Sequence, residues 1–412
     1  MAKKKITATQ SATPQESASS DSAENSRQPL HSDAVHDAPG DSRLPRTDGD
    51  LVAIRDFIQR LPKTDIHIHL DGSLRLETLH ELIRDADPEL REEAESAIEG
   101  TYEEAVDLRK CSMEALERVV TVGDRAQNLE QYLVPFAVTN LALQVPENVK
   151  RVTREIVFDA AAQNVRYLEL RFAPLLHLRL GASMNSIMEA VIEGLREAEL
   201  ASPSPISTGL IVCGMRQDVE ETIIAAELAC MYKEQGVVAF DIAGPERNNA
   251  PDMHLEAFKI IQNHMLPVTI HAGEGYGPRS IRSALYDVTA NRLGHGTRVY
   301  QDGDLFRYVV NNRIPLEMCL SSNVHTRTVH SYQTHPILSY LRRGVRVTIN
   351  TDNTLISNTT INEEYEKVWR YLHASKDDLK QIAMNGFNSS FQEYNESNRL
   401  REEMRKFIHD LD

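Results

Sequence analysis

The stretch Thr64-Asp65-Ile66-His67-Ile68-His69-Leu70-Asp71-Gly72 decides how the rest of the chain is interpreted. Apolar and polar residues alternate in it, which is the two-residue period of a β-strand whose two faces are buried differently. The apolar side chains then point one way, and His67 and His69 point the other, where their nitrogens can meet at one metal ion. A partly solvated edge strand can carry the same residues. The stretch alone therefore leaves a metal site and a polar strand face as alternatives.

The composition is that of a soluble globular protein. The chain has 412 residues, of which 41% are hydrophobic and 26% are charged, enough for one large domain or two ordinary ones. Lys and Arg total 45 against 61 Asp and Glu, a formal net charge of −16. This balance disfavours nucleic acid and anionic membranes as partners, because both are bound through basic residues. No apolar run reaches the roughly 18 residues of a membrane span.

The cysteines and the N-terminus indicate a cytoplasmic protein. Cys111, Cys213, Cys230 and Cys319 are far apart and form no C-x-x-C pair, so no disulfide framework is expected. The basic first residues have no apolar run behind them and do not form a signal peptide. We therefore expect a reducing cytosol.

The first 50 residues are rich in Ser, Ala, Asp, Gln and Pro and poor in large apolar residues. Such a segment cannot bury enough surface to offset its chain entropy. We expect a disordered tail over residues 1–50, followed by one folded domain over residues 51–412.

Strands and helices alternate through the folded part. The expected strands lie at 65–72, 165–173, 209–215, 237–243, 267–272, 292–296, 314–319 and 346–350. Strand–helix alternation implies parallel strands, and eight of them predict a closed (β/α)₈ TIM barrel, an α/β fold. A helical insertion over 76–163 follows the first strand, and extra C-terminal helices follow residue 361. An open doubly wound sheet is the alternative.

Ionisable residues collect at the expected strand ends, where the active site of such a barrel lies. They are His67, His69, Asp71, Asp241, His271, Glu274, His295 and Asp352. Singly, each has a structural explanation: a core histidine, a helix N-cap, or an acid in a first helical turn. Together they would be costly to bury unpaired, and a metal ion removes that cost. Neutral imidazoles and one carboxylate around an ion with an open position are typical of catalytic zinc.

The remaining histidines have no comparable neighbours in the sequence. We assign His80, His177, His254, His264, His330, His335, His373 and His409 to surface or ordinary packing roles, and place His31 and His36 in the tail.

Four spaced motifs carry a family resemblance from about Leu61 to beyond Trp369. They are Pro62-Lys63 through His67-Ile-His69-Leu-Asp71-Gly72, His271-Ala-Gly-Glu274, Gly294-His295-Gly296 and Asn350-Thr-Asp352. In this order they resemble the adenosine deaminases of the metal-dependent hydrolase superfamily. The resemblance implies the barrel, one zinc ion per chain, and the reaction of adenosine with water to give inosine and ammonia.

The resemblance also implies a role for each motif residue. His67, His69, His271 and Asp352 would bind zinc, Glu274 would protonate the purine N1, and His295 would act on the metal-bound water. Asp71 would hold a ribose hydroxyl, and the backbone of Gly244 would meet the purine N3. These roles agree with the chemistry, because zinc lowers the pKa of bound water and a buried carboxyl can keep the proton that N1 needs.

Two positions depart from the family pattern. Asn353 stands where many relatives have a second aspartate that meets the purine N7, and its amide can donate to N7 without any pKa adjustment. We therefore expect Asn353 to keep that contact. Leu320 replaces a usual proline in a loop near the mouth, a change without an expected effect on the chemistry.

The substrate is expected to be a purine nucleoside, adenosine and also 2′-deoxyadenosine. Adenine-specific relatives tend to carry glutamate at the Asp71 position, so the shorter aspartate favours a nucleoside. No cluster of Lys and Arg marks the strand ends, but Arg75 and Arg279 lie near motif residues and leave AMP open. The sequence does not indicate an oligomeric state.

Two other classes remain as alternatives. A multi-metal phosphoesterase can also open with a His-x-His strand, but it needs further ligands, and the second, third and seventh strands end without histidine. A catalytically silent nucleoside-binding protein would be indicated by loss of Glu274 or His295, and both are present. The helical insertion is expected to cover the mouth as a lid that excludes water.

Overall fold

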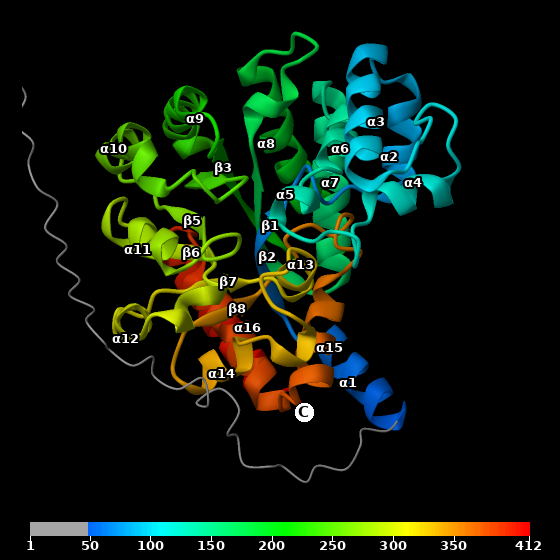
Figure 1. The fold of residues 1–412 in the computed structure, drawn as a ribbon. Coiled ribbons are helices and arrows are strands. Elements are labelled where there is room, and N and C mark those ends of the chain that lie inside the picture. Colours follow the sequence, from blue (N-terminus) through cyan, green and yellow to red (C-terminus); the bar gives the residue numbers. More distant parts are fainter. Residues whose placement is uncertain (1–47) are drawn as a thin grey trace, which may run out of the picture. The chain divides into compact units, whose positions relative to one another are not determined.

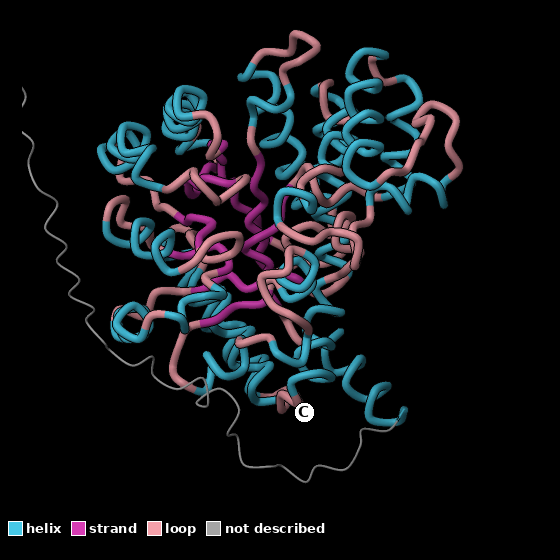
Figure 2. The backbone as a smooth tube through the Cα atoms, in the orientation of Figure 1, coloured by secondary structure: helices cyan, strands magenta, loops and turns pink. Residues whose placement is uncertain are grey.

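Eight parallel strands form the centre of the protein, as the computed structural model shows for residues 48–412. Their bounds are β1 Lys63–His69, β2 Val165–Phe172, β3 Ser207–Met215, β4 Val237–Ala243, β5 Thr269–Ala272, β6 Arg292–His295, β7 Leu316–Met318 and β8 Val347–Ile349. All eight expected strands are present, with boundaries shifted by a few residues. In Figure 2 they lie together in the middle of the domain, with helices outside them.

The strands close into a ring. They pair in the orders β1-β2-β3-β4 and β5-β6-β7-β8, every pair parallel. Parallel bridges at Phe240↔Val268 and Ile68↔Asp352 join these two groups at both edges. The second bridge is held by His69 N–H donating to Asp352 O (2.7 Å) and Asp352 N–H donating to His67 O (2.8 Å). The expected (β/α)₈ barrel is therefore confirmed over the open doubly wound sheet.

Both faces of β1 are buried, whereas its alternation predicted two differently buried faces. All seven residues from Lys63 to His69 are buried. The polar face of β1 points into the barrel, whose interior is packed with side chains, and the apolar face packs beneath the helices. Alternation here separates a polar interior from an apolar exterior layer.

Seventeen α-helices surround and extend the barrel within the described residues (Figure 1). They are α1 Asp48–Arg60, α2 Leu76–Leu82, α3 Pro88–Tyr102, α4 Met113–Val120, α5 Leu129–Tyr132, α6 Phe136–Leu141, α7 Pro146–Ala162, α8 Met184–Ala201, α9 Val219–Met231, α10 Leu255–Asn263, α11 Pro278–Tyr286, α12 Gly303–Asn311, α13 Leu320–His325, α14 Ile337–Arg342, α15 Ile361–Leu372, α16 Lys376–Ser389 and α17 Tyr394–His409.

The helical insertion after β1 runs from α2 to α7, as expected. Within the insertion, residues 129–141 form two short helices, α5 and α6. Pro135 stands at the N-cap of α6, and a proline has no N–H for a helix that continues from the preceding turn. The break places the α5–α6 corner over the carboxyl ends of the strands.

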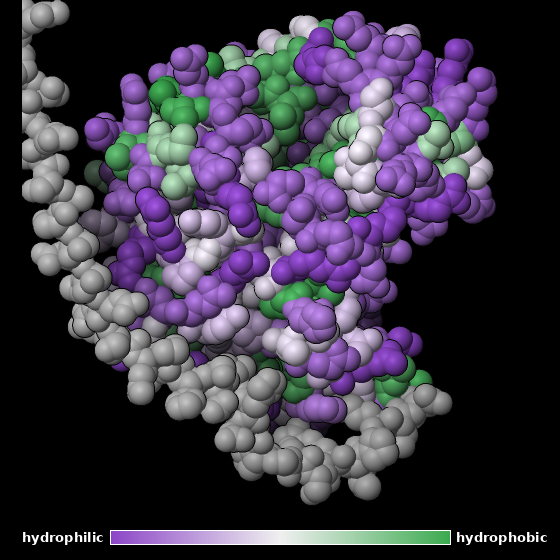
Figure 3. Space-filling model, in the orientation of Figure 1, coloured by the Kyte–Doolittle hydropathy of each residue, from purple (hydrophilic) through white to green (hydrophobic). Residues whose placement is uncertain are grey.

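The expected tail falls almost wholly outside the described residues, and α1 begins at Asp48. The face shown in Figure 3 is mostly hydrophilic, in keeping with the acidic composition. Among residues 48–412, no helix has the length and apolarity that crossing a membrane requires.

Candidate active site

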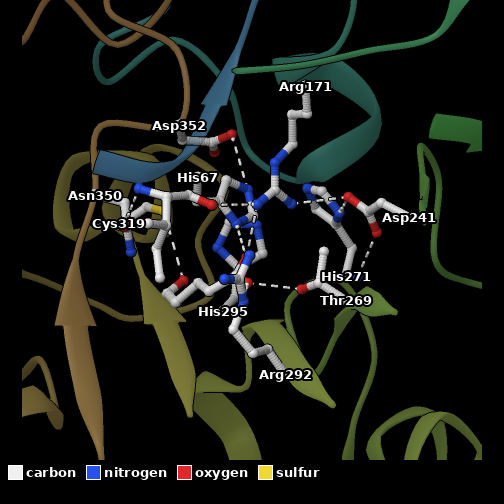
Figure 4. A network of polar contacts seen from close by, with 12 residues as sticks. His67, Arg171, Asp241, Thr269, His271, Arg292, His295, Cys319, Asn350 and Asp352 are labelled. Carbon is white, nitrogen blue, oxygen red and sulfur yellow. Dashed lines mark hydrogen bonds and ion pairs between the residues drawn. The ribbon is translucent and has the colours of Figure 1, made fainter. Parts of the chain in front are cut away.

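Strands β1 and β5 and the segment that follows β8 bring the predicted metal ligands together. His69 Nε2 lies 3.2 Å from His271 Nε2 and 3.4 Å from Asp352 Oδ1. His67 Nε2 lies 3.5 Å from the same Asp352 oxygen. One ligand atom from each of His67, His271, His295 and Asp352 lies within 4.8 Å of the other three. With His69, five nitrogen and oxygen donors thus converge at the barrel mouth. Figure 4 labels His67, His271, His295 and Asp352 among them.

This cluster fits a divalent metal ion. His67 Nε2 is buried without a hydrogen-bond partner, and two imidazole Nε2 atoms face each other. Burial lowers the pKa of His69 and of His271. Burial opposes the charged form of Asp352, but the adjacent imidazoles hold its pKa below the usual range. For His69, His271 and Asp352, these shifts favour the neutral imidazoles and the ionised carboxylate that zinc ligation requires.

Two buried carboxylates orient the metal-facing histidines from behind. His67 Nδ1 lies 2.8 Å from Glu317 Oε2, and His271 Nδ1 lies 2.9 Å from Asp241 Oδ2. Arg171 donates from Nη1 to Asp241 Oδ2 and from Nη2 to Glu317 Oε2, both at 2.8 Å. Such carboxylate–histidine pairs fix the ring orientation of a ligand and raise its basicity. The guanidinium joins the two pairs into one unit, and Figure 4 shows Arg171 in contact with Asp241 beside His271.

Glu317 was not identified from the sequence. The available signal is a charged residue inside the apolar strand β7, Leu316-Glu317-Met318. Glu317 Oε1 also accepts from Arg292 Nε (2.5 Å) and Thr269 Oγ1 (2.7 Å). The Glu317 carboxylate is therefore occupied by Arg171 and Arg292. A second metal ion would need this carboxylate free. Within residues 48–412, the cluster at the mouth is the sole group with metal-ligand geometry, which disfavours the multi-metal phosphoesterase.

Two site residues leave their strands in a left-handed backbone conformation. His295 has φ 59° and Asp352 has φ 63°, values that residues with a Cβ adopt rarely and that often mark functional sites. Gly294 allows the close approach behind them. A Cβ on Gly294 would lie 3.1 Å from both His271 Cα and His67 Cε1, so any larger residue would displace the histidine pair.

Glu274 lies beside His295 and is organised by a second glutamate, Glu246. The Glu246 carboxylate accepts from the backbone N–H of Gly273 (2.7 Å), Glu274 (3.0 Å) and Tyr276 (2.9 Å). Burial, followed by the negative charges of Asp352 and Glu246, raises the pKa of Glu274 well above its usual range. Glu246 follows β4 and carried no signal in the sequence, because its partners come from the next strand–helix loop.

A cavity of about 410 Å³ opens on this cluster. Asp71, Gly244, Glu274 and Asn353 all line it, so the structure brings every predicted substrate-binding residue to the same space as the metal cluster. Burial raises the pKa of Asp71 to about 7. The α5–α6 corner supplies an apolar wall of Leu129, Tyr132, Leu133, Val134 and Phe136.

None of the described residues that line this cavity is a lysine or an arginine. Arg75 pairs with Asp159, with Nη2 2.6 Å from Oδ1. Arg279 lines a separate cavity with Arg282 and Tyr286, which shares no residue with the first. Neither of the two arginines that left AMP open is therefore at the site.

Asn353 contacts the helical insertion. Its Nδ2 donates to Tyr132 Oη at 3.1 Å, and Tyr132 Oη lies 2.7 Å from Ser357 Oγ. Asn353 Oδ1 is buried without a hydrogen-bond partner. Tyr132 is thus another residue at the site that sequence reasoning did not single out.

The family model described as adenosine deaminase matches residues 62–407. The chain belongs to the adenosine deaminase family. A relative named adenosine deaminase from Clostridium kluyveri is 36% identical over 351 residues, which cover 85% of this chain and 95% of the relative. A relative of the same name from Clostridium botulinum is 32% identical over 354 residues, covering 86% and 98%.

Solved structures share the fold. The Arabidopsis protein ADAL complexed with IMP is 28% identical, with a TM-score of 0.74 over 87% of this chain and 100% of that one. The Arabidopsis N6-mAMP deaminase MAPDA is 29% identical, with a TM-score of 0.72 over 85% and 99%. An adenine deaminase from Arthrobacter aurescens, 22% identical with a TM-score of 0.73 over 85% and 99%, agrees in fold.

Proposed function

We propose that this member of the adenosine deaminase family catalyses the hydrolytic deamination of adenosine and 2′-deoxyadenosine, giving inosine or 2′-deoxyinosine and ammonia. The observation that carries the proposal is one cavity that combines the histidine–aspartate cluster and a glutamate of raised pKa, with no lysine or arginine among the described lining residues. The family membership agrees with this reaction.

One zinc ion per chain would be held by His67, His69, His271 and Asp352. When bound, zinc supplies a water of lowered pKa for attack on C6 of the purine. The Glu317 and Asp241 carboxylates keep the His67 and His271 rings aimed at the ion.

Glu274 supplies a proton to the purine N1. Attack at C6 moves electrons into the ring and onto N1, so a proton delivered there stabilises the transition state. The raised pKa of Glu274 keeps the carboxyl protonated for this donation. His295 Nε2, 3.4 Å from Glu274 Oε2, lies where it can contact the attacking oxygen.

Asp71, Gly244 and Asn353 orient the nucleoside. Asp71 would accept from a ribose hydroxyl, the backbone of Gly244 would meet N3, and the Asn353 amide would donate to N7. All three line the cavity. Asp71→Ala should lower kcat/KM for adenosine by roughly tenfold or more, the scale of losing a hydrogen bond to a charged group, and leave zinc content unchanged.

A nucleotide is the second candidate substrate, since the similar Arabidopsis structures are described with IMP or as an N6-mAMP deaminase. A 5′-phosphate needs cationic or N–H partners. The absence of lysine and arginine among the described lining residues favours the uncharged nucleoside.

Loss of absorbance near the adenosine maximum tests the proposal directly. The zinc-loaded protein is assayed on adenosine, 2′-deoxyadenosine, adenine and AMP at equal concentrations, with and without a chelator. Chelator-sensitive turnover of the two nucleosides is expected. Equal or faster turnover of AMP or adenine would replace the substrate assignment, and turnover that survives metal removal would overturn the mechanism.

The cellular role follows from the reaction. We place the activity in purine salvage in the cytoplasm, where four unpaired cysteines are stable.

A further inference from the structure

A chain of buried hydrogen bonds runs from a helix N-terminus to His295. Asn323, on α13, occupies its middle. Its Nδ2 lies 3.1 Å from His295 Nδ1, and its Oδ1 lies 3.1 Å from His335 Nε2. The Ile337 N–H at the start of α14 donates to His335 Nδ1 at 3.3 Å. Asn323, His335 and His295 are 0%, 3% and 1% exposed, so water does not substitute for these partners.

The direction of every bond in this chain follows from its first member. A backbone N–H can only donate, so His335 Nδ1 accepts. A neutral imidazole has one N–H, and His335 must therefore carry it on Nε2 and donate to Asn323 Oδ1. Burial lowers the pKa of His335 to about 3, which keeps the ring neutral.

The donor and acceptor roles of Asn323 and His295 follow in the same way. Because Asn323 Oδ1 accepts from His335, the Asn323 amide presents Nδ2 to His295, and an amide nitrogen can only donate. His295 Nδ1 therefore accepts, which leaves the proton of the neutral ring on Nε2, the nitrogen near Glu274. Thr297 Oγ1 also lies 2.9 Å from Asn323 Oδ1. Its hydroxyl donates to this oxygen, which agrees with Oδ1 acting as an acceptor.

We propose that Asn323 and His335 are positioning residues that hold His295 in the Nε2–H tautomer, so that His295 presents a hydrogen-bond donor to the attacking oxygen. This inference rests on the proposed deamination for its kinetic consequence, but the tautomer itself does not depend on the substrate. His335 was assigned an ordinary packing role from the sequence, because its link to His295 runs through Asn323, a side chain on helix α13.

The variant Asn323→Asp tests the direction of the hydrogen bond between residue 323 and His295, because aspartate has nearly the same shape as asparagine. A carboxylate only accepts, so it still accepts from His335 but forces His295 to donate from Nδ1. The proton then moves from Nε2 to Nδ1 and leaves a lone pair facing the cavity. His335→Gln is the conservative counterpart, since its amide can still donate to Asn323 Oδ1.

Ring ¹⁵N chemical shifts of the zinc-loaded, ¹⁵N-histidine-labelled protein report the tautomer. The His295 resonances are assigned by their loss in His295→Gln. We expect an unprotonated Nδ1 in the wild type and in His335→Gln, and a protonated Nδ1 in Asn323→Asp. A protonated Nδ1 in the wild type, or an unchanged tautomer in Asn323→Asp, would overturn the proposal.

Steady-state kinetics then test the consequence. Asn323→Asp should lower kcat for adenosine roughly 10²-fold, the scale of losing one donor to a developing oxyanion, with KM changed less than threefold. Asn312→Asp, an exposed site at the end of α12, adds the same charge and should match the wild type. A reversed tautomer with wild-type kcat would refute the positioning role. Wild-type protein without adenosine turnover would refute the proposed function, while the ¹⁵N shifts would still decide the tautomer.

Discussion

At the scale of single residues, the site depends on buried charges that never touch the substrate. Glu317 is fully buried and accepts from Arg171, Arg292 and Thr269 while it lies against His67. Burying one uncompensated carboxylate would cost several kcal/mol, but two guanidiniums offset it. The pKa of Glu317 is therefore held well below its usual range, although burial opposes this.

The variant Glu317→Gln should weaken zinc binding roughly 10- to 100-fold, as substitutions behind metal ligands generally do. The amide keeps the shape but places an N–H₂ group against donors and no longer fixes the His67 ring. Competition with a chromophoric chelator measures the affinity. Glu256→Gln, an exposed position on α10, is the matched control. Equal zinc affinity in Glu317→Gln and the wild type would contradict the role assigned to Glu317.

The raised pKa of Glu274 predicts the alkaline limb of the pH profile. Proton donation to N1 needs the protonated carboxyl, so kcat should be high below this pKa and fall as pH rises through it. Glu274→Gln cannot release a proton and should lower kcat at least 10²-fold at every pH with zinc content preserved. Rates measured from pH 5 to 10 on a metal-saturated enzyme check both. A Glu274→Gln variant that keeps wild-type activity would show that another group protonates N1.

The sequence predicts residues at strand ends far better than the residues behind them. The sequence predicts that the strand-end residues lie together, because every strand of a parallel barrel ends at the same mouth. These residues are His67, His271, Glu274 and Asp352. Glu317 and Asn323 could not be predicted in this way, because their roles depend on which side chains face them across β6, β7 and α13. Those contacts are set by register and side-chain direction, which sequence spacing does not fix.

At the scale of elements, the lid segment, residues 121–136, is attached to the barrel mouth at several points. Val122 N–H donates to Ile356 O (2.9 Å), and Arg327 Nη2 donates to Asp124 O (2.8 Å). Val122, Ala126, Leu129, Tyr132 and Ile356 form a small apolar cluster separate from the main core. A segment whose buried apolar residues form a small cluster outside the main core can open at lower free energy than the barrel.

Tyr132→Phe should loosen the lid segment at the point where it meets the substrate. The hydroxyl lost here contacts Asn353 and Ser357, and one net hydrogen bond is worth about 1 kcal/mol. We expect KM for adenosine to rise about fivefold relative to the wild type. With a transition-state analogue present, hydrogen exchange in residues 121–136 should be faster in the variant than in the wild type. Tyr102→Phe, which removes a hydroxyl bonded to Gln131 O (2.6 Å) outside the cavity, is the control. If Tyr132→Phe and Tyr102→Phe change KM and hydrogen exchange equally, the Tyr132 hydroxyl has no specific role at the cavity.

Secondary structure was predictable at this scale because the periodicity of each strand is local. Apolar periodicity alone does not indicate the break between α5 and α6, because the helical spacing of apolar residues continues on both sides of Pro135. This break matters for function, since it turns the apolar face of the insertion toward the cavity.

At the scale of the whole molecule, the proposed metal ligands span the seam where the barrel closes. Asp352 joins β8 to β1 through its backbone, by bonds to His67 O and from His69 N–H, and its side chain faces the same two histidines. His271 adds a ligand from β5, on the other half of the ring. A bound ion therefore holds both halves of the barrel and the β1–β8 seam at one point.

Metal removal should consequently destabilise the entire domain and not only the mouth. A ligand present at 1,000 times its Kd stabilises the folded state by about 4.1 kcal/mol. Because the unfolding entropy grows with chain length, each kcal/mol shifts Tm by roughly 1–2 °C in a domain as large as Asp48–Asp412. We expect chelation to lower Tm by about 5 °C in one cooperative transition, and stoichiometric zinc to restore it. Differential scanning calorimetry on the apo, reloaded and Asp352→Asn proteins measures this, with Asp352→Asn expected to respond weakly to zinc. An unchanged Tm after verified zinc removal would mean that the backbone bridges alone close the barrel and that the ion serves the chemistry only.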